Sequence, residues 1–253
     1  MTRFSANLGF LWSDRPLVDA IHAAHDAGFE AVECHWPYDH DPAEVKAALD
    51  ATGLAMLGLN TLRGDVASGD NGLTALPGRR DEARMAIDQA IAYAGFINTP
   101  KIHVMAGFAE GMQAEACFID NLRYATKTAP DITFLIEPLN QYDAPGYFLN
   151  HTDQARRVIE SVGAANLKLM FDCYHIQILE GDLTRRLNAN LDITGHIQFA
   201  GVPSRGRPDR GEIDYRHVFA HIAEMGYDAP LGAEYKPEDG DTDNSLGWME
   251  TLR

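Results

Sequence analysis

Short apolar runs of strand-forming residues alternate with longer segments of helical periodicity along almost the whole chain. Eight strand candidates can be counted, at residues 4–12, 31–36, 54–61, 101–107, 132–138, 167–175, 193–200 and 230–237. Between them lie amphipathic segments, such as the one in which Leu17, Val18, Ile21, Ala24 and His25 fall at helical spacing. This alternation is typical of βα units around a parallel sheet.

Eight strands with helical segments between them predict a (β/α)8 barrel, the TIM-barrel form of the α/β class. A chain of 253 residues is long enough for one such barrel, so we expect residues 1–253 to form a single domain. The last helix is expected to be reduced, because only NSLGWMETLR follows the last strand. A doubly wound sheet is the alternative, but no GxGxxG motif supports its nucleotide-binding form.

The net charge of −16 opposes binding to a polyanion such as DNA, because nucleic-acid affinity depends on Lys and Arg. No apolar run approaches the roughly 20 residues that cross a bilayer, and MTRFSANLGFLW lacks the regions of a signal peptide. We therefore expect a cytoplasmic protein that binds neither nucleic acid nor a membrane. The sequence leaves both a monomer and a homo-oligomer open.

The last four strand candidates each finish with an oxygen-bearing side chain that can bind a metal: Glu137, Asp172, Gln198 and Glu234. In a barrel the strand C-termini face the same end, so these side chains are expected to converge near the axis. Three clustered carboxylates raise one another's pKa, and a divalent cation relieves that repulsion. An oxygen-rich set favours Mg²⁺ or Mn²⁺. For any one of the four, the alternative is a loop cap or a salt-bridge partner.

Several long motifs occur in order along the chain: ALPGRRDEA, IEPLN, PGYFLN, DCYHIQILEGDL, HIQFAG, GEIDY and GAEYKP. In these motifs the sequence resembles the hydroxypyruvate isomerase family of the xylose-isomerase-like barrels. The resemblance implies a divalent-metal-dependent isomerisation of hydroxypyruvate to 2-hydroxy-3-oxopropanoate (tartronate semialdehyde). It also implies acid/base roles for Glu137 and Glu234, and metal ligation by Asp172 and Gln198 as the remaining positions.

Two related activities share much of this pattern, 2-oxo-tetronate isomerase and ketose 3-epimerase. The epimerases usually have His as the third ligand, so Gln198 departs from them and matches the two acid isomerases. IEPLN and DCYHIQ look closer to hydroxypyruvate isomerase. Where the family tends to have an acidic residue in its strand-seven loop, this chain has Arg207 in PSRGRPD, which bears on the charge of the substrate pocket.

Moving a carbonyl between adjacent carbons requires removal of a proton, an enediolate and reprotonation of the neighbouring carbon. A metal that chelates the substrate oxygens places positive charge on the developing oxyanion. We hypothesise that Glu137 and Glu234 face the substrate from two sides, one abstracting the proton and the other returning it. Each glutamate would then use one oxygen for the metal and the other for the proton.

Other polar residues are expected to line the pocket. His175 lies three residues beyond Asp172, where it can polarise a substrate oxygen; the alternative is a cap on the next helix. His103 is a pocket or a core residue. Asn60, Glu33 and His35 are further candidates for the pocket wall, because they lie toward the ends of strand candidates.

The carboxylate of the substrate needs a cation, and Arg suits bidentate binding. Arg205 is the first choice, followed by Lys236 and then by Arg63, for which an exposed loop charge is the simpler interpretation. Trp12 and Trp36 could form an apolar wall or belong to the core. The long loops 62–74 and 139–150 are expected to be functional, and PGYFLN either closes over the ligand or fixes its loop to the barrel.

Two other classes of function compete with an isomerase. A metal-dependent nuclease that resembles endonuclease IV would need additional His ligands for a zinc cluster and a basic face, and neither is apparent. A non-catalytic barrel that binds a small acid would have lost ligands, whereas all four positions are filled. The sequence therefore favours an enzyme with a small-molecule substrate.

Overall fold

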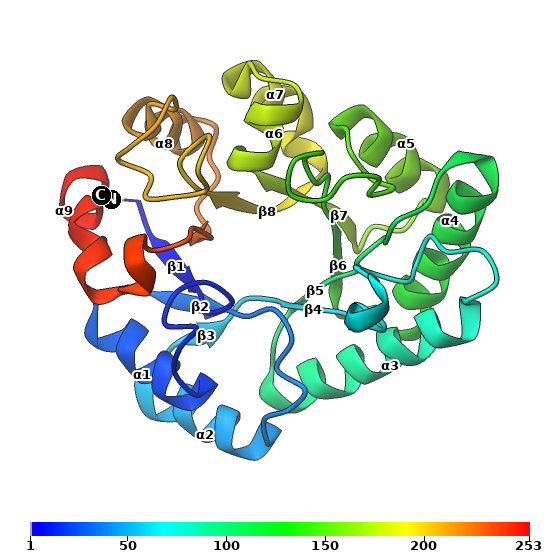
Figure 1. Ribbon diagram of the computed structural model, residues 1–253, viewed down its shortest axis with the longest axis horizontal. Coiled ribbons are helices and arrows are strands. Elements are labelled where there is room, and N and C mark those ends of the chain that lie inside the picture. The colour runs from blue at the N-terminus through cyan, green and yellow to red at the C-terminus, as the bar shows by residue number, and fades with distance from the viewer. Residues whose placement is uncertain (1) are drawn as a thin grey trace.

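Short parallel strands surround the central axis of the structure, a computed structural model that describes residues 2–253 (Figure 1). Within these residues the strands are β1 (Phe4–Asn7), β2 (Ala31–Glu33), β3 (Ala55–Met56), β4 (Leu59–Asn60), β5 (Lys101–His103), β6 (Thr133–Ile136), β7 (Leu167–Asp172), β8 (Thr194–Phe199) and β9 (Leu231–Ala233). They form one sheet in the order β3-β2-β1-β9-β8-β7-β6-β5-β4. Because the first strand pairs with the last, the predicted barrel is confirmed.

The predicted strand 54–61 closes the barrel by pairing with two neighbours in turn. Its first part, β3, pairs with β2, and its second part, β4, pairs with β5. Between the two parts the chain stays bound to β2, because the N–H of Leu57 donates to the carbonyl of Val32 at 2.7 Å. The eight strand positions expected from the sequence are therefore all present in the described part of the chain, with this one divided.

Helices cover the outside of the sheet (Figure 1). The described residues contain α1 (Leu17–Asp26), α2 (Pro42–Thr52), α3 (Arg80–Ile97), α4 (Gly111–Thr128), α5 (Thr152–Val162), α6 (Cys173–Leu179), α7 (Leu183–Asn190), α8 (Tyr215–Glu224) and α9 (Met249–Leu252). Short 3-10 helices are η1 (Val66–Ser68), η2 (Leu191–Ile193), η3 (Glu238–Gly240) and η4 (Asp243–Trp248). Two helices, α6 and α7, lie between β7 and β8, and the short α9 confirms the reduced final helix.

Local signals in the sequence set the helix ends. α2 begins after Asp41, whose carboxylate accepts a hydrogen bond from the N–H of Ala43 at 2.9 Å, and Pro42 fits the first turn because that turn leaves its N–H groups free. Gly53 directly follows α2 and Gly163 directly follows α5, with φ of 73° and 71°. Glycine adopts this left-handed conformation without a steric penalty, so both residues stop their helices.

An aromatic cluster packs β1 and β8 against the C-terminal helices. Phe4, Phe199, Phe219 and Trp248 are all buried. The rings of Phe4 and Trp248 lie 4.9 Å apart and those of Phe199 and Phe219 lie 4.8 Å apart, both in edge-to-face geometry. This packing holds the N- and C-terminal ends of the chain together, and the two termini lie near each other in Figure 1. None of the helices in residues 2–253 is both long and apolar enough to span a membrane.

Candidate active site

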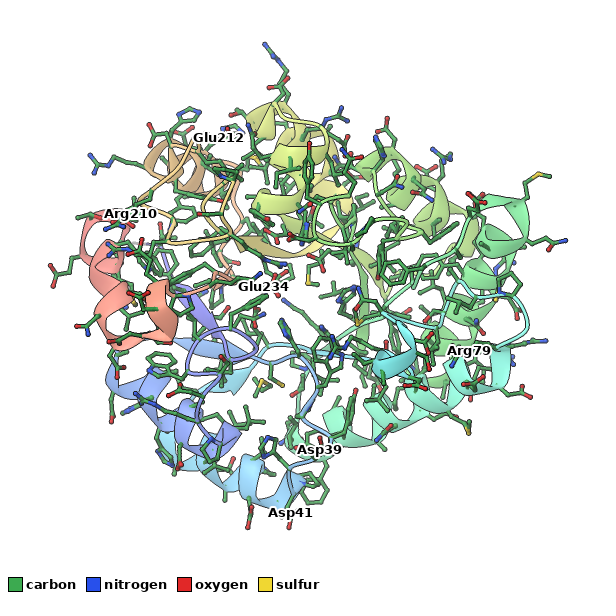
Figure 2. The ribbon with its side chains drawn as sticks, in the orientation of Figure 1. Asp39, Asp41, Arg79, Arg210, Glu212 and Glu234 are labelled. Carbon is green, nitrogen blue, oxygen red and sulfur yellow. The ribbon has the colours of Figure 1, made fainter. Side chains whose placement is uncertain are left out.

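Four buried polar side chains lie at the C-terminal ends of neighbouring strands. Glu137 follows β6, Asp172 ends β7, Gln198 is the penultimate residue of β8, and Glu234 follows β9. Strand register pairs Asp172 with Gln198 and Gln198 with Gly232, so the ends lie at one level. None of the four is more than 5% exposed. Figure 2 shows Glu234 at the central opening of the barrel, so the predicted ligands gather at one end of it.

β6 leads into this site through Phe134, Leu135 and Ile136, which are buried in the barrel wall. Truncating a side chain such as Phe134 to alanine typically costs about 3–5 kcal/mol of folding free energy. Strand pairing ends at Ile136, and Pro138 fits this point because it has no N–H to donate. The packed wall therefore fixes where the carboxylate of Glu137 lies.

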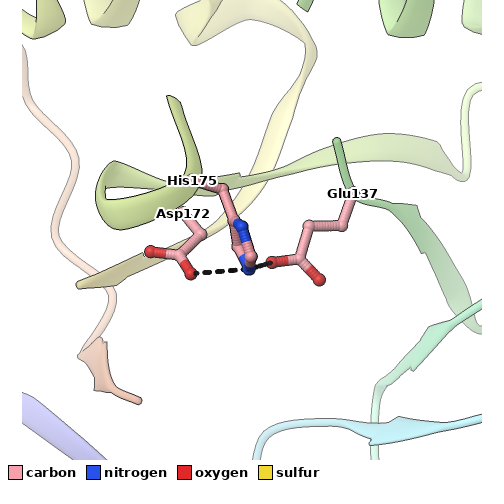
Figure 3. A group of neighbouring side chains, drawn as sticks. All are labelled: Glu137, Asp172 and His175. Atoms are coloured by element: carbon pink, nitrogen blue, oxygen red, sulfur yellow. Dashed lines mark ion pairs between the residues drawn. The ribbon is translucent and has the colours of Figure 1, made fainter. Parts of the chain in front are cut away.

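Glu137, Asp172 and His175 form a buried group whose donor atoms lie within 4.8 Å of one another (Figure 3). His175 Nε2 is 3.9 Å from Glu137 Oε1 and 3.7 Å from Asp172 Oδ2. None of these three atoms has a hydrogen-bond partner among residues 2–253. Buried polar atoms are normally paired, so these atoms need a further partner, and for the two carboxylate oxygens that partner could be a metal ion.

The partners of His175 determine which of its ring nitrogens carries the proton. The backbone N–H and the side-chain amide of Asn140 both approach His175 Nδ1, at 3.0 and 2.9 Å. Nδ1 is therefore the acceptor, and the proton of the neutral ring is on Nε2. Burial, reinforced by the charge of Arg205, lowers the pKa of His175 well below its usual value. His175 thus presents a neutral N–H donor to the site.

The alternative prediction that His175 caps the next helix is wrong. Asp172 precedes α6, and its Oδ1 accepts a hydrogen bond from the N–H of Tyr174 at 2.9 Å. Capping fixes one oxygen of Asp172 and leaves Oδ2 without a hydrogen-bond partner among the described residues. Asp172 therefore both caps α6 and directs a free oxygen into the site.

Arg205, in the loop after β8, lies against two of the four strand-end residues. Its Nη2 is 2.5 Å from Glu234 Oε2 and 3.7 Å from Asp172 Oδ2. Its Nη1 is 3.3 Å from Asp143 Oδ2. The guanidinium therefore offsets part of the negative charge of the site.

Aromatic rings hold the guanidinium of Arg205 in this place. Its Cζ lies 4.8 Å from the ring centre of Phe10 and 5.1 Å from that of Tyr174. Cation–π contacts of this kind orient a planar guanidinium so that its edge faces anions, here Glu234 and Asp143. Arg207, two residues further on, pairs instead with Asp209 at 2.6 Å. The departure of Arg207 from the family pattern thus places no cation on the carboxylates of the site.

The surroundings move the pKa values of the two glutamates in opposite directions. Burial, together with the charges of Glu234 and Asp172, raises the pKa of Glu137 well above its usual range. Burial also acts on Glu234, but the charge of Arg205 and a hydrogen bond from His35 outweigh it and lower its pKa. Divergent pKa values in one site are the usual mark of an acid and a base.

Asp172 is the third carboxylate of the site. Burial raises its pKa to about 8, and the charge of Glu234 acts in the same direction. Asp172 and Glu137 therefore favour the protonated form near neutral pH when no cation is present.

Two further side chains bind Glu234 Oε1. The Asn7 amide donates to it at 2.9 Å, and His35 Nε2 lies at the same distance. His35 packs edge-on against Phe10, with ring centres 5.2 Å apart. His35 thus lies at the site, as its place near the end of β2 predicts.

Other predicted site residues lie at different distances from the carboxylates. His103 is buried, with Nδ1 at 3.7 Å from Glu137 Oε2, and burial lowers its pKa to about 4. Asn60 lines a small internal cavity that His103 also lines. Lys236 is exposed, and its Nζ lies 5.8 Å from the ring of Phe10 at the mouth of the site. Asn60 therefore shares a cavity with His103 and Gln198, whereas Lys236 is an exposed residue near Phe10.

Arg63, Trp36 and Trp12 do not contact the carboxylates in the described structure. The guanidinium of Arg63 stacks 3.8 Å above the ring of Trp36. Trp12 is a core residue, 1% exposed, and its indole N–H donates to Asp243 Oδ1 at 2.7 Å. The apolar wall suggested for Trp12 is therefore wrong, because β1 ends at Asn7 and the chain then turns away.

The segment PGYFLN is fixed to the barrel by its aromatic residues. The hydroxyl of Tyr147 accepts a hydrogen bond from the N–H of Ala106 at 2.8 Å, and Phe148 packs on Phe118 with ring centres 5.6 Å apart. Tyr147 and Phe148 are both buried. Of the two interpretations of this loop, the structure supports the one in which it is packed in place.

Sequence reasoning missed three residues that support the site. Asn7 donates a hydrogen bond to Glu234, and Asn140 donates to Nδ1 of His175 and so keeps the proton of its ring on Nε2. His196 is buried two residues before Gln198. Asn7 ends β1, a position that could have been read as Glu137 was. His196 and Gln198 share one face of β8 by strand alternation, which was a second available signal.

A family model described as "Xylose isomerase-like TIM barrel" matches residues 21–252. The chain belongs to this family. It is 45% identical to the 2-oxo-tetronate isomerase of Cupriavidus necator, over 99% of this chain and 98% of the relative. It is 39% identical to the hydroxypyruvate isomerase of Escherichia coli, over the full length of both. These relatives confirm the resemblance to the hydroxypyruvate isomerase branch.

A solved structure agrees with this membership. A Brucella melitensis protein described as "AP endonuclease, family 2" is 37% identical, with a TM-score of 0.95 over the full length of both chains. In residues 2–253, the groups of His, Cys, Asp and Glu that could hold a metal amount to Glu137, Asp172 and His175, which include a single histidine. The several additional His ligands that a zinc-cluster nuclease would need are not found in that group.

Proposed function

We propose that this protein is a divalent-metal-dependent isomerase of a small sugar acid. The first substrate is hydroxypyruvate, converted to 2-hydroxy-3-oxopropanoate, and the second candidate is a 2-oxo-tetronate. The observation that carries the proposal is the buried set of Glu137, Asp172, Gln198 and Glu234 at one end of the barrel. The tetronate is included because the 2-oxo-tetronate isomerase is 45% identical to this chain.

The donor atoms of this set fit Mg²⁺ or Mn²⁺. Glu137 Oε1, Asp172 Oδ2 and Gln198 Oε1 are buried oxygens without hydrogen-bond partners among the described residues. With Glu234 they form a set of hard oxygen ligands, which suits these cations better than zinc. His175 is excluded as a ligand, because its Nε2 carries the proton. When bound, the cation supplies positive charge to the substrate oxygens during proton transfer.

One glutamate then removes a proton from a substrate carbon, and the other returns a proton to the adjacent carbon. Glu234 is ionised by its contacts with Arg205 and His35, so it accepts the proton from C3 of hydroxypyruvate. Glu137, with its raised pKa, returns a proton to C2. The hydroxyl proton on the C3 oxygen moves to the C2 oxygen, so that C3 becomes the aldehyde carbon and C2 carries the hydroxyl group. His175 Nε2–H donates a hydrogen bond to a substrate oxygen. Arg205 binds the substrate carboxylate through its Nε–H, which has no hydrogen-bond partner among the described residues.

A substrate panel tests the proposed function. Chelator-treated protein is assayed with added Mg²⁺ or Mn²⁺ against hydroxypyruvate, a 2-oxo-tetronate and a ketose such as D-fructose. We expect metal-dependent turnover of an acid substrate and little turnover of the ketose, because a ketose has no carboxylate for Arg205 to bind. Turnover of the ketose alone, or of none of the three, would contradict the proposal.

Replacing Arg205 with methionine is expected to raise KM for the acid substrate about 10- to 100-fold, because the carboxylate loses a charge-assisted hydrogen bond. Arg207→Met is the matched control: it removes a cation from the same loop, but one that pairs with Asp209. Steady-state kinetics of both variants measure the difference. An unchanged KM in the Arg205 variant would show that another residue binds the carboxylate.

Affinity for Mn²⁺ is expected to rise with pH between about 6 and 8, by up to about tenfold per unit. The pKa of Asp172 is about 8 without a cation, so below that value Asp172 must release a proton before it can bind. Mn²⁺ titrations across this range, in two buffers with different protonation enthalpies, measure both the slope and the protons released. An affinity that does not change with pH would contradict the assignment of Asp172 as a ligand.

A further inference from the structure

A fourth buried carboxylate, Glu33, lies inside the barrel and outside the proposed ligand set. It follows β2's apolar residues and is 3% exposed. Its Oε1 accepts hydrogen bonds from Gln198 Nε2 at 2.9 Å and from Asn7 Nδ2 at 3.1 Å. Its Oε2 lies 2.5 Å from His196 Nε2 and 3.5 Å from the hydroxyl of Ser5. Four side chains from two other strands thus converge on one carboxylate.

The contact with Glu33 determines which end of the Gln198 amide faces the metal site. A glutamine side chain has a donor end and an acceptor end of nearly the same shape, so packing alone does not distinguish them. Glu33 accepts from Nε2, which leaves Gln198 Oε1 without a hydrogen-bond partner in the described structure. Only the oxygen can bind a cation. The acceptor oxygen of Glu33 therefore orients the Gln198 amide so that its oxygen, and not its nitrogen, faces the metal site.

Asn7 connects Glu33 to Glu234 through hydrogen bonds. Its Nδ2 donates both to Glu33 Oε1 at 3.1 Å and to Glu234 Oε1 at 2.9 Å, and its Oδ1 accepts from the N–H of Gly9 at 2.9 Å. All the polar atoms of this amide are therefore used. Glu33 fixes Gln198 directly and Glu234 through Asn7, so it is linked to two of the four proposed ligands.

A glycine makes the contact between Glu33 and Gln198 sterically feasible. The two residues lie on β2 and β8, and β1 and β9 separate these strands in the sheet. On β9, a Cβ at Gly232 would lie 2.6 Å from Glu33 Oε1 and 2.8 Å from Gln198 Cγ. Both distances are far below van der Waals contact. Any larger residue at position 232 would push the two side chains apart.

We propose that Glu33 is a positioning residue for the metal site, which holds Gln198 with its oxygen toward the cation and holds Glu234 through Asn7. The inference rests on the proposed function, since it assigns Glu33 a role toward the metal of that site. Side chains that orient metal ligands from behind typically change metal affinity about 10- to 100-fold when they are removed. Glu33 therefore acts through Gln198 and Glu234 and does not need to touch the substrate.

Binding of Mn²⁺ to purified protein, followed by electron paramagnetic resonance, tests the proposal together with kcat at saturating Mn²⁺. Glu33→Met keeps the volume and removes both acceptor oxygens, so we expect Mn²⁺ affinity to fall about 10- to 100-fold, with a lower kcat. Glu33→Gln keeps one acceptor oxygen and should recover most of the affinity. Glu44→Gln, on an exposed position of α2, is the matched control and should match the wild type.

A folded Glu33→Met protein with wild-type Mn²⁺ affinity and kcat would overturn the proposal. Circular dichroism and thermal melting establish that the variants are folded. If Glu33→Met does not fold, Gly232→Ala decides the question: it keeps both side chains, separates them by one methyl group, and should weaken Mn²⁺ binding in the same way. A wild type that neither binds Mn²⁺ nor turns over substrate would contradict the proposed function, whereas a normal wild type with unaffected variants contradicts this inference alone.

Discussion

Replacing Glu234 with glutamine is expected to lower kcat for the acid substrate about 1,000-fold or more, with a smaller change in KM. Glutamine has nearly the same shape but cannot accept a proton, so the step that begins the reaction is lost. Glu234 is ionised and so can accept the proton, because Arg205 and His35 outweigh burial and lower its pKa. Steady-state kinetics at saturating Mn²⁺ measure the loss.

Exchange of substrate protons with solvent distinguishes Glu234 from Glu137. In deuterium oxide, we expect Glu137→Gln to wash deuterium into C3 of hydroxypyruvate without forming product, because abstraction by Glu234 survives. Glu234→Gln should show neither exchange nor product. Starting from the aldehyde product the two patterns should be reversed, because the roles of acid and base reverse with direction.

The proposed ligand role of these residues requires a control for metal binding. Each variant is compared at a Mn²⁺ concentration that saturates it, and Glu44→Gln reports any effect of losing an exposed carboxylate. Retention of more than about a tenth of kcat by Glu234→Gln would contradict its role as the base, because a positioned base typically contributes at least about 100-fold. Exchange in Glu234→Gln and not in Glu137→Gln would show that the two roles are assigned the wrong way round.

The ends of the later strands were predictable from the sequence because the signal there is local. An apolar run marks a buried strand, and the next polar residue lies at its C-terminal end, as Glu137 does after Ile136. The order of βα units then places successive ends side by side, without any knowledge of long-range contacts. The predicted convergence includes Asp172 and Gln198, and these two residues are register partners in the structure.

The supporting contacts could not be predicted in the same way, since they join distant parts of the chain. His196 meets Glu33 from 163 residues away, and Asn7 meets Glu234 from 227 residues away. Their distances depend on the curvature of the barrel and on the absence of a side chain at Gly232. The place of Arg205 depends on Phe10, in the loop after β1, and on Tyr174, in α6. Such contacts follow from closure of the barrel, which no local pattern encodes.

Removal of the metal is expected to abolish turnover and to lower the thermal midpoint by about 5–10 °C. At a Mn²⁺ concentration about 100 times Kd, binding stabilises the folded protein by about 2.7 kcal/mol, and about 1 kcal/mol corresponds to about 2–4 °C in a chain of this size. The reason lies in the carboxylates: burial and mutual repulsion raise the pKa of Glu137 and of Asp172. Differential scanning calorimetry with a chelator, and then with Mn²⁺ added back, measures the shift.

The pH dependence of the thermal midpoint provides a second, independent test of the metal site. The pKa of Asp172 rises on folding to about 8, from about 3.9 in the unfolded chain. The metal-free folded protein therefore holds this proton more tightly than the unfolded chain does. The resulting stabilisation is complete below about pH 3.9 and is lost as the pH rises through about 8. The difference in midpoint between Mn²⁺-bound and metal-free protein should therefore widen from about pH 6 to about pH 8.

Asp172→Asn should remove most of this widening, whereas Asp209→Asn, which removes an exposed carboxylate in the loop after β8, should leave it unchanged. If Mn²⁺ does not raise the thermal midpoint at any of these pH values, a metal site at the strand ends is contradicted. The buried oxygens of Glu137 and Asp172 would then not bind the cation.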